Sequence, residues 1–108
     1  MSDIKDLMDR AEEIRVKYEE ANAKNGKEAW RIRDYTMGLV GDVGDLMKLV
    51  MAKENLRDMS EVDAKLSHEL ADCLWSILVI AAYYNVDLDK EFGNTMKTIT
   101  ERIARNEA

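Results

Sequence analysis

Apolar residues recur at helical spacing along most of the chain. Between residues 3 and 23 they are separated by three or four positions, and the outer positions are charged. This spacing predicts an amphipathic helix. The polar segment 24–27 ends it, with Gly26 as its C-cap glycine. The apolar stripe of this helix consists of Ile4, Leu7, Ala11, Ile14, Tyr18 and Ala21.

The second and third helices are predicted on either side of a polar loop. The second covers about residues 30–53, and residues 54–59 form the loop. Ser60 is suited to cap the N-terminus of the third helix, which ends near Tyr84. Asn85 follows and favours a left-handed termination.

A fourth helix is predicted to begin with Asp87 or Asp89 as its cap and to reach about Arg105. No linker, repeat or low-complexity segment interrupts the pattern, so residues 1–108 are expected to form one all-α domain with a four-helix bundle-like protomer. The inner stripe of the fourth helix consists of Leu88, Phe92, Met96, Ile99 and Ile103.

The third helix is apolar on nearly all sides. From residue 70 to residue 84 its polar groups are Asp72, Ser76 and the tyrosine hydroxyls. A helix that is hydrophobic all round is buried. Three other helices from a chain of 108 residues cannot easily surround it. We therefore expect a partner subunit to cover part of it, so that oligomerisation completes the bundle.

Composition supports a helical, cytoplasmic protein. The chain has no proline and only five glycines, which argues against a β-sandwich or barrel. Its single cysteine, Cys73, has apolar neighbours and is expected to be a small buried residue. The polar residues 1–6 lack the apolar core of a signal peptide. The longest apolar stretch contains Asp72, which indicates a buried helix rather than a membrane span.

The net charge of −6 disfavours binding to the phosphate backbone of DNA or RNA. It does not exclude a nucleotide whose charge is bridged by metal, because a bound cation reverses the local electrostatics.

Two pairs of acids interrupt the apolar segments. Asp42 and Asp45 lie three apart in the apolar run of residues 39–47, and Glu69 and Asp72 lie three apart at the head of the most hydrophobic segment. Residues three apart share a helix face. A carboxylate in apolar surroundings is costly unless it is paired, protonated or bound to metal. If the two helices pack antiparallel, all four acids can face one another and form a site for Mg²⁺ or Mn²⁺.

Two other interpretations of these acids are open. Acidic pairs are common on solvated faces, and Glu12/Glu13, Glu19/Glu20 and Asp58/Glu61 are assigned there. A di-iron bundle requires Glu-x-x-His motifs. The only histidine, His68, does not follow a glutamate at that spacing and is expected at the surface.

Three segments carry a family resemblance. Residues 39–46 (LVGDVGDL) match the pattern LvGEvGEL, residues 68–75 (HELADCLW) match EELaDvLwy, and residues 85–88 (NVDL) match gvDL. These patterns are typical of the MazG-like nucleotide pyrophosphohydrolases, which the chain resembles over roughly residues 34–92.

The resemblance implies an all-α nucleoside triphosphate pyrophosphatase related to dCTP pyrophosphatases and dimeric dUTPases. It implies a homodimer or homotetramer, with Asp42, Asp45, Glu69 and Asp72 as Mg²⁺ ligands.

The chain departs from the family pattern at two places. The first motif carries Asp at both positions where Glu is usual, so the metal must lie closer to that helix or be reached through water. On the last helix, Thr95 and Ile99 stand where relatives commonly have Lys and Asn. Lys97 and Asn94 lie near these positions but face other directions. Lys97 is still a candidate substrate contact, and Lys48, one turn beyond Asp45, is a second candidate for phosphate contact, or a solvated lysine.

The expected reaction converts a (deoxy)nucleoside triphosphate to the monophosphate and pyrophosphate, through a metal-activated water rather than a side-chain nucleophile. Trp30, Trp75 and Tyr83 are candidates for the nucleobase pocket, or else core residues. Two alternatives remain: a non-catalytic relative that binds nucleotide or metal, and a structural oligomerisation module built on the third helix.

Overall fold

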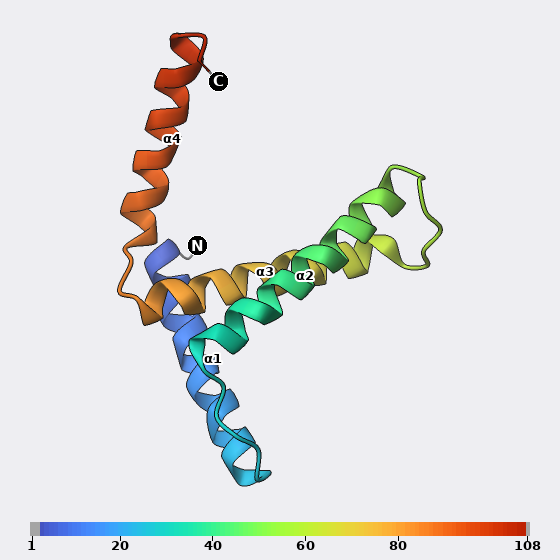
Figure 1. The fold of residues 1–108 in the computed structure, drawn as a ribbon, viewed down its shortest axis with the longest axis vertical. Coiled ribbons are helices and arrows are strands. Elements are labelled where there is room, and N and C mark those ends of the chain that lie inside the picture. The colour runs from blue at the N-terminus through green and yellow to red at the C-terminus, as the bar shows by residue number, and fades with distance from the viewer. Residues whose placement is uncertain (1–2, 108) are drawn as a thin grey trace.

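A computed structural model describes residues 3–107, and within this range the chain forms four α-helices and no strand (Figure 1). The predicted all-α class is therefore confirmed. The helices are α1 (Ile4–Lys24), α2 (Ile32–Lys53), α3 (Val62–Tyr83) and α4 (Leu88–Ala104).

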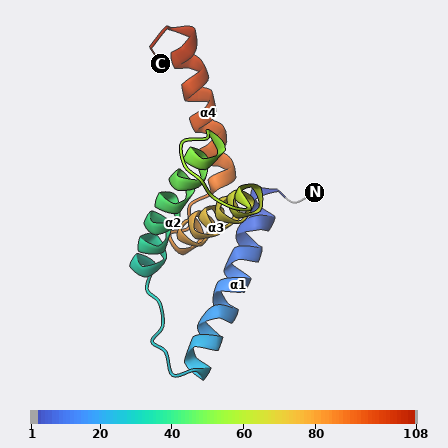
Figure 2. The same ribbon diagram turned by 90° about the vertical axis from the view of Figure 1, so that its right-hand side faces the viewer.

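Helices α2 and α3 form a long antiparallel hairpin, and α1 crosses the open end of this hairpin on the α3 side (Figures 1 and 2). The most buried cluster lies at this crossing, where Ala11 of α1 meets Tyr35 of α2 and Leu78 and Val79 of α3. Val79 is fully buried. The core is therefore at the open end, and the middle of the hairpin is held by α2 and α3 alone.

Several predicted helix ends are confirmed. Gly26 follows α1 with φ of 69°, and Asn85 follows α3 with φ of 55°. Asp87 caps α4, since its Oδ1 accepts a hydrogen bond from the Lys90 N–H at 3.1 Å. Left-handed residues here end one helix and let the chain turn toward the next.

Two predicted starts are wrong. Ser60 does not cap α3; the cap position is Glu61, whose φ of 53° turns the chain into the helix without a side-chain hydrogen bond. Trp30 lies before α2, because Asp34 accepts the Arg31 N–H at 2.8 Å and fixes the helix start there.

Helix α4 extends away from the other three (Figures 1 and 2). Its few contacts are with α1, and none of its residues is buried. Phe92 and Ile103, predicted on an inner stripe, are each 61% exposed. The prediction holds for Leu88, which packs against the core cluster, but is wrong for Phe92 and Ile103 in a single chain, because periodicity identifies an apolar face but not the surface that covers it.

Helix α3 is the one helix among the described residues that is long and apolar enough to cross a membrane, by length and composition only. In the protomer, 28% of its most apolar window is buried. The other residues of this window are half-buried or exposed.

Candidate metal centre

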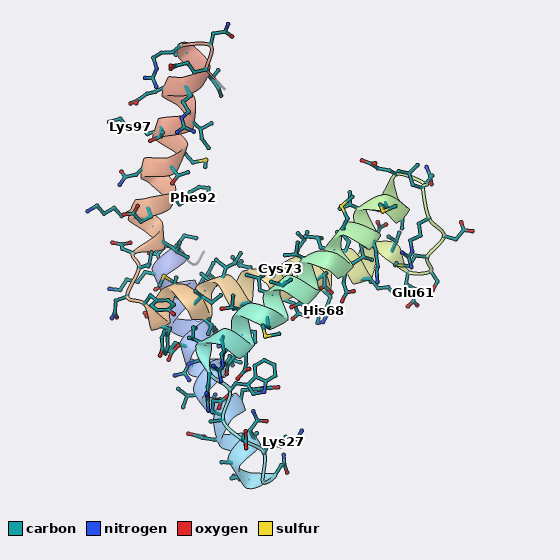
Figure 3. All side chains as sticks on the ribbon, in the orientation of Figure 1. Lys27, Glu61, His68, Cys73, Phe92 and Lys97 are labelled. Atoms are coloured by element: carbon teal, nitrogen blue, oxygen red, sulfur yellow. The ribbon has the colours of Figure 1, made fainter. Side chains whose placement is uncertain are left out.

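Three of the four predicted acids converge where α2 and α3 lie side by side. Asp42 projects from α2, and Glu69 and Asp72 project from α3. One carboxylate oxygen of each residue lies within 4.8 Å of the others. Figure 3 labels His68 and Cys73, which bracket this acidic segment midway along the hairpin. The antiparallel packing that brings these acids together agrees with the sequence prediction.

Asp45 lies at the edge of this group. Its side chain is 61% exposed, and its Oδ1 is 3.9 Å from Lys48 Nζ. It is still close enough for its negative charge to raise the pKa of Glu69. Asp45 is therefore an outer member of the site, and the central group has three carboxylates.

Glu69 carries the clearest electrostatic cost. Burial raises the pKa of its carboxyl above the ordinary value, and the neighbouring carboxyl of Asp42 raises it further. The charges of Asp45 and Asp72 act in the same direction. Its Oε1 is buried and has no hydrogen-bond partner among the described residues. A buried acceptor without a partner normally has a structural or functional reason.

Asp72 is more accessible than its apolar sequence neighbours indicated. Its side chain is 43% exposed, and Oδ2 lies 3.1 Å from Nε2 of His68, one helical turn earlier. Its apolar neighbours in sequence point to other sides of α3: Trp75 packs against the core, whereas Leu70 and Leu74 are exposed. His68 itself is 76% exposed by side chain, which confirms the expected surface position.

The chemistry of this group fits a hard divalent cation. All three central donors are carboxylate oxygens, the ligand type that Mg²⁺ and Mn²⁺ prefer. One oxygen of each residue lies within 4.8 Å of the others, so side-chain rotation could bring all three onto one cation. Such an ion would also give the buried Glu69 Oε1 a partner. Although aspartate is one methylene shorter than glutamate, the Asp42 carboxylate still reaches the acids of α3.

Cys73 is not part of the donor set. Burial raises the pKa of its thiol, and the charges of Asp42, Glu69 and Asp72 raise it further. The thiol is therefore protonated at neutral pH, and Cys73 is the small buried residue that the sequence predicted.

An aromatic cluster lies between the α1–α2 connection and α3. Trp30 and Trp75, both predicted for a nucleobase pocket, are joined through Tyr35, with ring centroids 5.2 and 5.7 Å from it. Tyr18 contacts both tryptophans edge to face. A Cβ added at Gly38 would lie 4.0 Å from the Trp30 ring, which places that ring over α2 one turn before Asp42.

Glu19 holds this cluster together and was wrongly assigned to the solvated surface. One of its oxygens accepts a hydrogen bond from the backbone N–H of Trp30 at 2.9 Å, and the other accepts one from the Tyr35 hydroxyl at 2.8 Å. Burial raises the pKa of Tyr35, and the hydrogen bond to Glu19 raises it further. No local pattern distinguishes Glu19 from Glu20, because its partners are 11 and 16 residues away.

The remaining predicted site residues are separated from the carboxylates. Tyr83 pairs with Tyr84, with ring centroids 4.9 Å apart, near the C-terminal end of α3. Lys97 lies on the projecting helix α4, far from His68 and Cys73 (Figure 3). Within one protomer, the predicted lysine that lies near the acids is Lys48.

Comparison with known proteins gives no further assignment. No family model matches the chain, and neither a curated protein nor a solved structure shows significant similarity to it.

Proposed function

We propose that this chain hydrolyses a (deoxy)nucleoside triphosphate to the monophosphate and pyrophosphate, with Mg²⁺ or Mn²⁺ as cofactor. The observation that supports this most directly is the convergence of Asp42, Glu69 and Asp72 around a buried oxygen that has no partner. The sequence resemblance to the MazG-like nucleotide pyrophosphohydrolases supports the same assignment, because its acidic motifs contain these three residues.

In this proposal, Asp42, Glu69 and Asp72 hold the cation, and Asp45 completes the site from its edge. When bound, the ion would supply positive charge that stabilises the phosphates and lowers the pKa of the attacking water. The water oxygen forms a bond to the α-phosphorus while the bond to the bridging oxygen breaks, and pyrophosphate leaves. A carboxylate of the group accepts the proton of the attacking water.

The nucleobase would lie on the aromatic cluster. Trp30 is 40% exposed as a residue, and its ring lies over α2 one turn from Asp42; Trp75 lies one turn from Asp72. An exposed aromatic face beside a phosphate-binding group suits a planar base. Trp30 and Trp75 are therefore the proposed base-contacting residues.

The function is tested by pyrophosphate release from a panel of nucleoside triphosphates with and without Mg²⁺. We expect metal-dependent turnover that Asp72→Asn abolishes. Asp58→Asn, a change of the same chemistry in the exposed loop after α2, is the matched control and should retain wild-type turnover.

Other outcomes separate the alternatives. Binding of Mn²⁺ or nucleotide without turnover would indicate a non-catalytic relative. A thermal midpoint that responds to neither metal nor nucleotide would indicate a structural helical module and contradict the metal site.

We further propose that the protomer is completed by a second copy. On α2, Val40, Val43, Met47 and Val50 are exposed at spacings of three and four residues, and on α3, Leu70, Leu74 and Ile77 are exposed at the same spacings. Because the two helices are antiparallel, helical geometry places both stripes on the side of the hairpin away from the carboxylates. Two such faces, packed together, form a four-helix core.

In this arrangement α3 is an internal helix of a cytoplasmic homodimer, or of a homotetramer built from two dimers, which explains why it is apolar on nearly all sides. It leaves the carboxylate side of each hairpin open to nucleotide. We propose no nucleic-acid or membrane partner, because the chain is acidic and the apolar face of α3 continues onto α2.

A further inference from the structure

A cavity of about 300 Å³ lies beside the carboxylates, on the loop side of the hairpin. Its lining includes two acids, Asp45 and Glu69, and three basic side chains, Lys48, Lys65 and His68. The lysines come from different helices, Lys48 from α2 and Lys65 from α3. The cavity therefore joins the metal site to a pair of cations.

The two lysines are free to bind an anion. Lys65 forms no ion pair within residues 3–107, and Lys48 is only loosely paired with Asp45, at 3.9 Å. The acid nearest Lys65 in sequence on the same helix, Asp63, is paired instead with Lys53 at 2.6 Å.

Lys65 is not placed to stabilise its own helix. It lies in the first turn of α3, where the helix dipole disfavours a cation. The positive charge of the Lys65 ammonium group instead adds to the positive potential at the N-terminus of α3. Together with Lys48 they make this end of the cavity attractive to negative charge.

We propose that Lys48 and Lys65 bind the β- and γ-phosphates of the substrate, and the pyrophosphate product, while the adjacent carboxylates hold the cation that the phosphates carry. A bare anion would be repelled by Asp45 and Glu69, and a bare cation by the lysines. In a metal–pyrophosphate complex, the cation faces the carboxylates and the phosphate oxygens face the lysines. The inference rests on the proposed function, and it supplies from α2 and α3 the phosphate-binding cations that α4 does not bring to the site.

The test is calorimetric binding of Mg²⁺–pyrophosphate to the full chain. We expect Lys65→Met and Lys48→Met each to weaken this binding about tenfold, the loss of one charge-assisted contact. Lys90→Met, which removes an exposed lysine of α4, should bind like wild type. Lys65→Arg should retain most of the affinity. Because a lysine repels a bare cation, binding of Mn²⁺ alone should not weaken in any variant, and the KM for nucleotide should rise in the two site variants.

The outcomes distinguish this inference from the proposed function. If Lys65→Met binds Mg²⁺–pyrophosphate as tightly as Lys90→Met does, while wild type binds Mn²⁺ and turns over nucleotide, the lysine assignment is overturned and the enzyme assignment stands. If wild type binds neither Mn²⁺ nor Mg²⁺–pyrophosphate, both are overturned.

Discussion

The environment of the Glu69 side chain indicates that it binds a ligand. Its carboxyl is kept toward the protonated form by burial and by three acidic neighbours, and one of its oxygens lacks a partner. In an isolated protomer without cation this arrangement costs stability, since like charges oppose ionisation. A residue with that cost and a buried oxygen without a partner is best explained by what it binds.

The first prediction concerns pH. Below the ordinary value of 4.5, Glu69 is protonated in both the folded and the unfolded chain. As the pH rises, the unfolded chain loses this proton first, so the free energy of unfolding falls until the pH passes the raised pKa of Glu69. In chelator, Glu69→Gln should remove this fall and raise the thermal midpoint at neutral pH by roughly 5 °C, measured by circular dichroism.

Addition of Mg²⁺ should raise the midpoint of wild type but not that of Glu69→Gln. The control is Glu54→Gln, which changes an exposed glutamate. Equal midpoints for the two variants across the pH range would contradict the electrostatic role given to Glu69.

The second prediction concerns Glu19. Glu19→Ala removes both hydrogen bonds that fix Trp30 and Tyr35 and leaves a buried hydroxyl without its acceptor. We expect the free energy of unfolding in urea to fall by about 2 kcal/mol. Glu20→Ala, at the exposed neighbouring position, should stay within about 0.5 kcal/mol of wild type. Similar losses for the two variants would show that the contacts of Glu19 contribute little.

At the scale of helices, the position of each helix in the sequence was predictable, but the helices that it contacts were less so. The four helices and most of their ends follow from spacing and caps, which are local properties of the sequence. The convergence of Asp42 with Glu69 and Asp72 was also predictable, because a polar loop joins two apolar helices and makes them antiparallel. The start of α3 was not, since Glu61 enters the helix through a left-handed conformation that no sequence rule assigns to glutamate.

The third prediction concerns α4. Asp87→Ala removes the acceptor of the Lys90 N–H, which costs about 1 kcal/mol at a helix N-terminus. Because α4 buries none of its residues in the protomer, we expect faster amide hydrogen exchange confined to residues 88–104. Asp89→Ala keeps the cap and should have the smaller effect. Faster exchange throughout α2 and α3 as well would show that α4 is coupled to the hairpin.

At the scale of the molecule, the protomer is open. Its radius of gyration is 17.0 Å, whereas a compact domain of this length has about 13 Å. Sequence reasoning predicts a partner for α3, which stays a prediction, and it could not place α1 or α4, because the direction of an amphipathic helix depends on contacts far away in sequence. The same limit explains Asp72, whose apolar neighbours in sequence lie on other sides of α3 and do not cover its carboxylate.

The fourth prediction is the oligomeric state. Size-exclusion chromatography with light scattering should give at least twice the protomer mass of 12.4 kDa. Val43→Glu places a charge on the exposed apolar face of α2 and should yield the 12.4 kDa species. Val16→Glu, at a comparably exposed position on α1, should leave the mass unchanged. A 12.4 kDa wild type would contradict the second copy, and association that requires lipid would point to a membrane surface instead.

Both tryptophans of the chain lie in the aromatic cluster that Glu19 secures. Intrinsic fluorescence excited in the indole band therefore reports on one small region, the junction of α1, α2 and α3, and gives no direct signal from α4. Emission that shifts when a nucleotide is added would register events at that junction. An optical melting curve of this protein would likewise follow the loss of the junction, while unwinding of the projecting helix passes unseen.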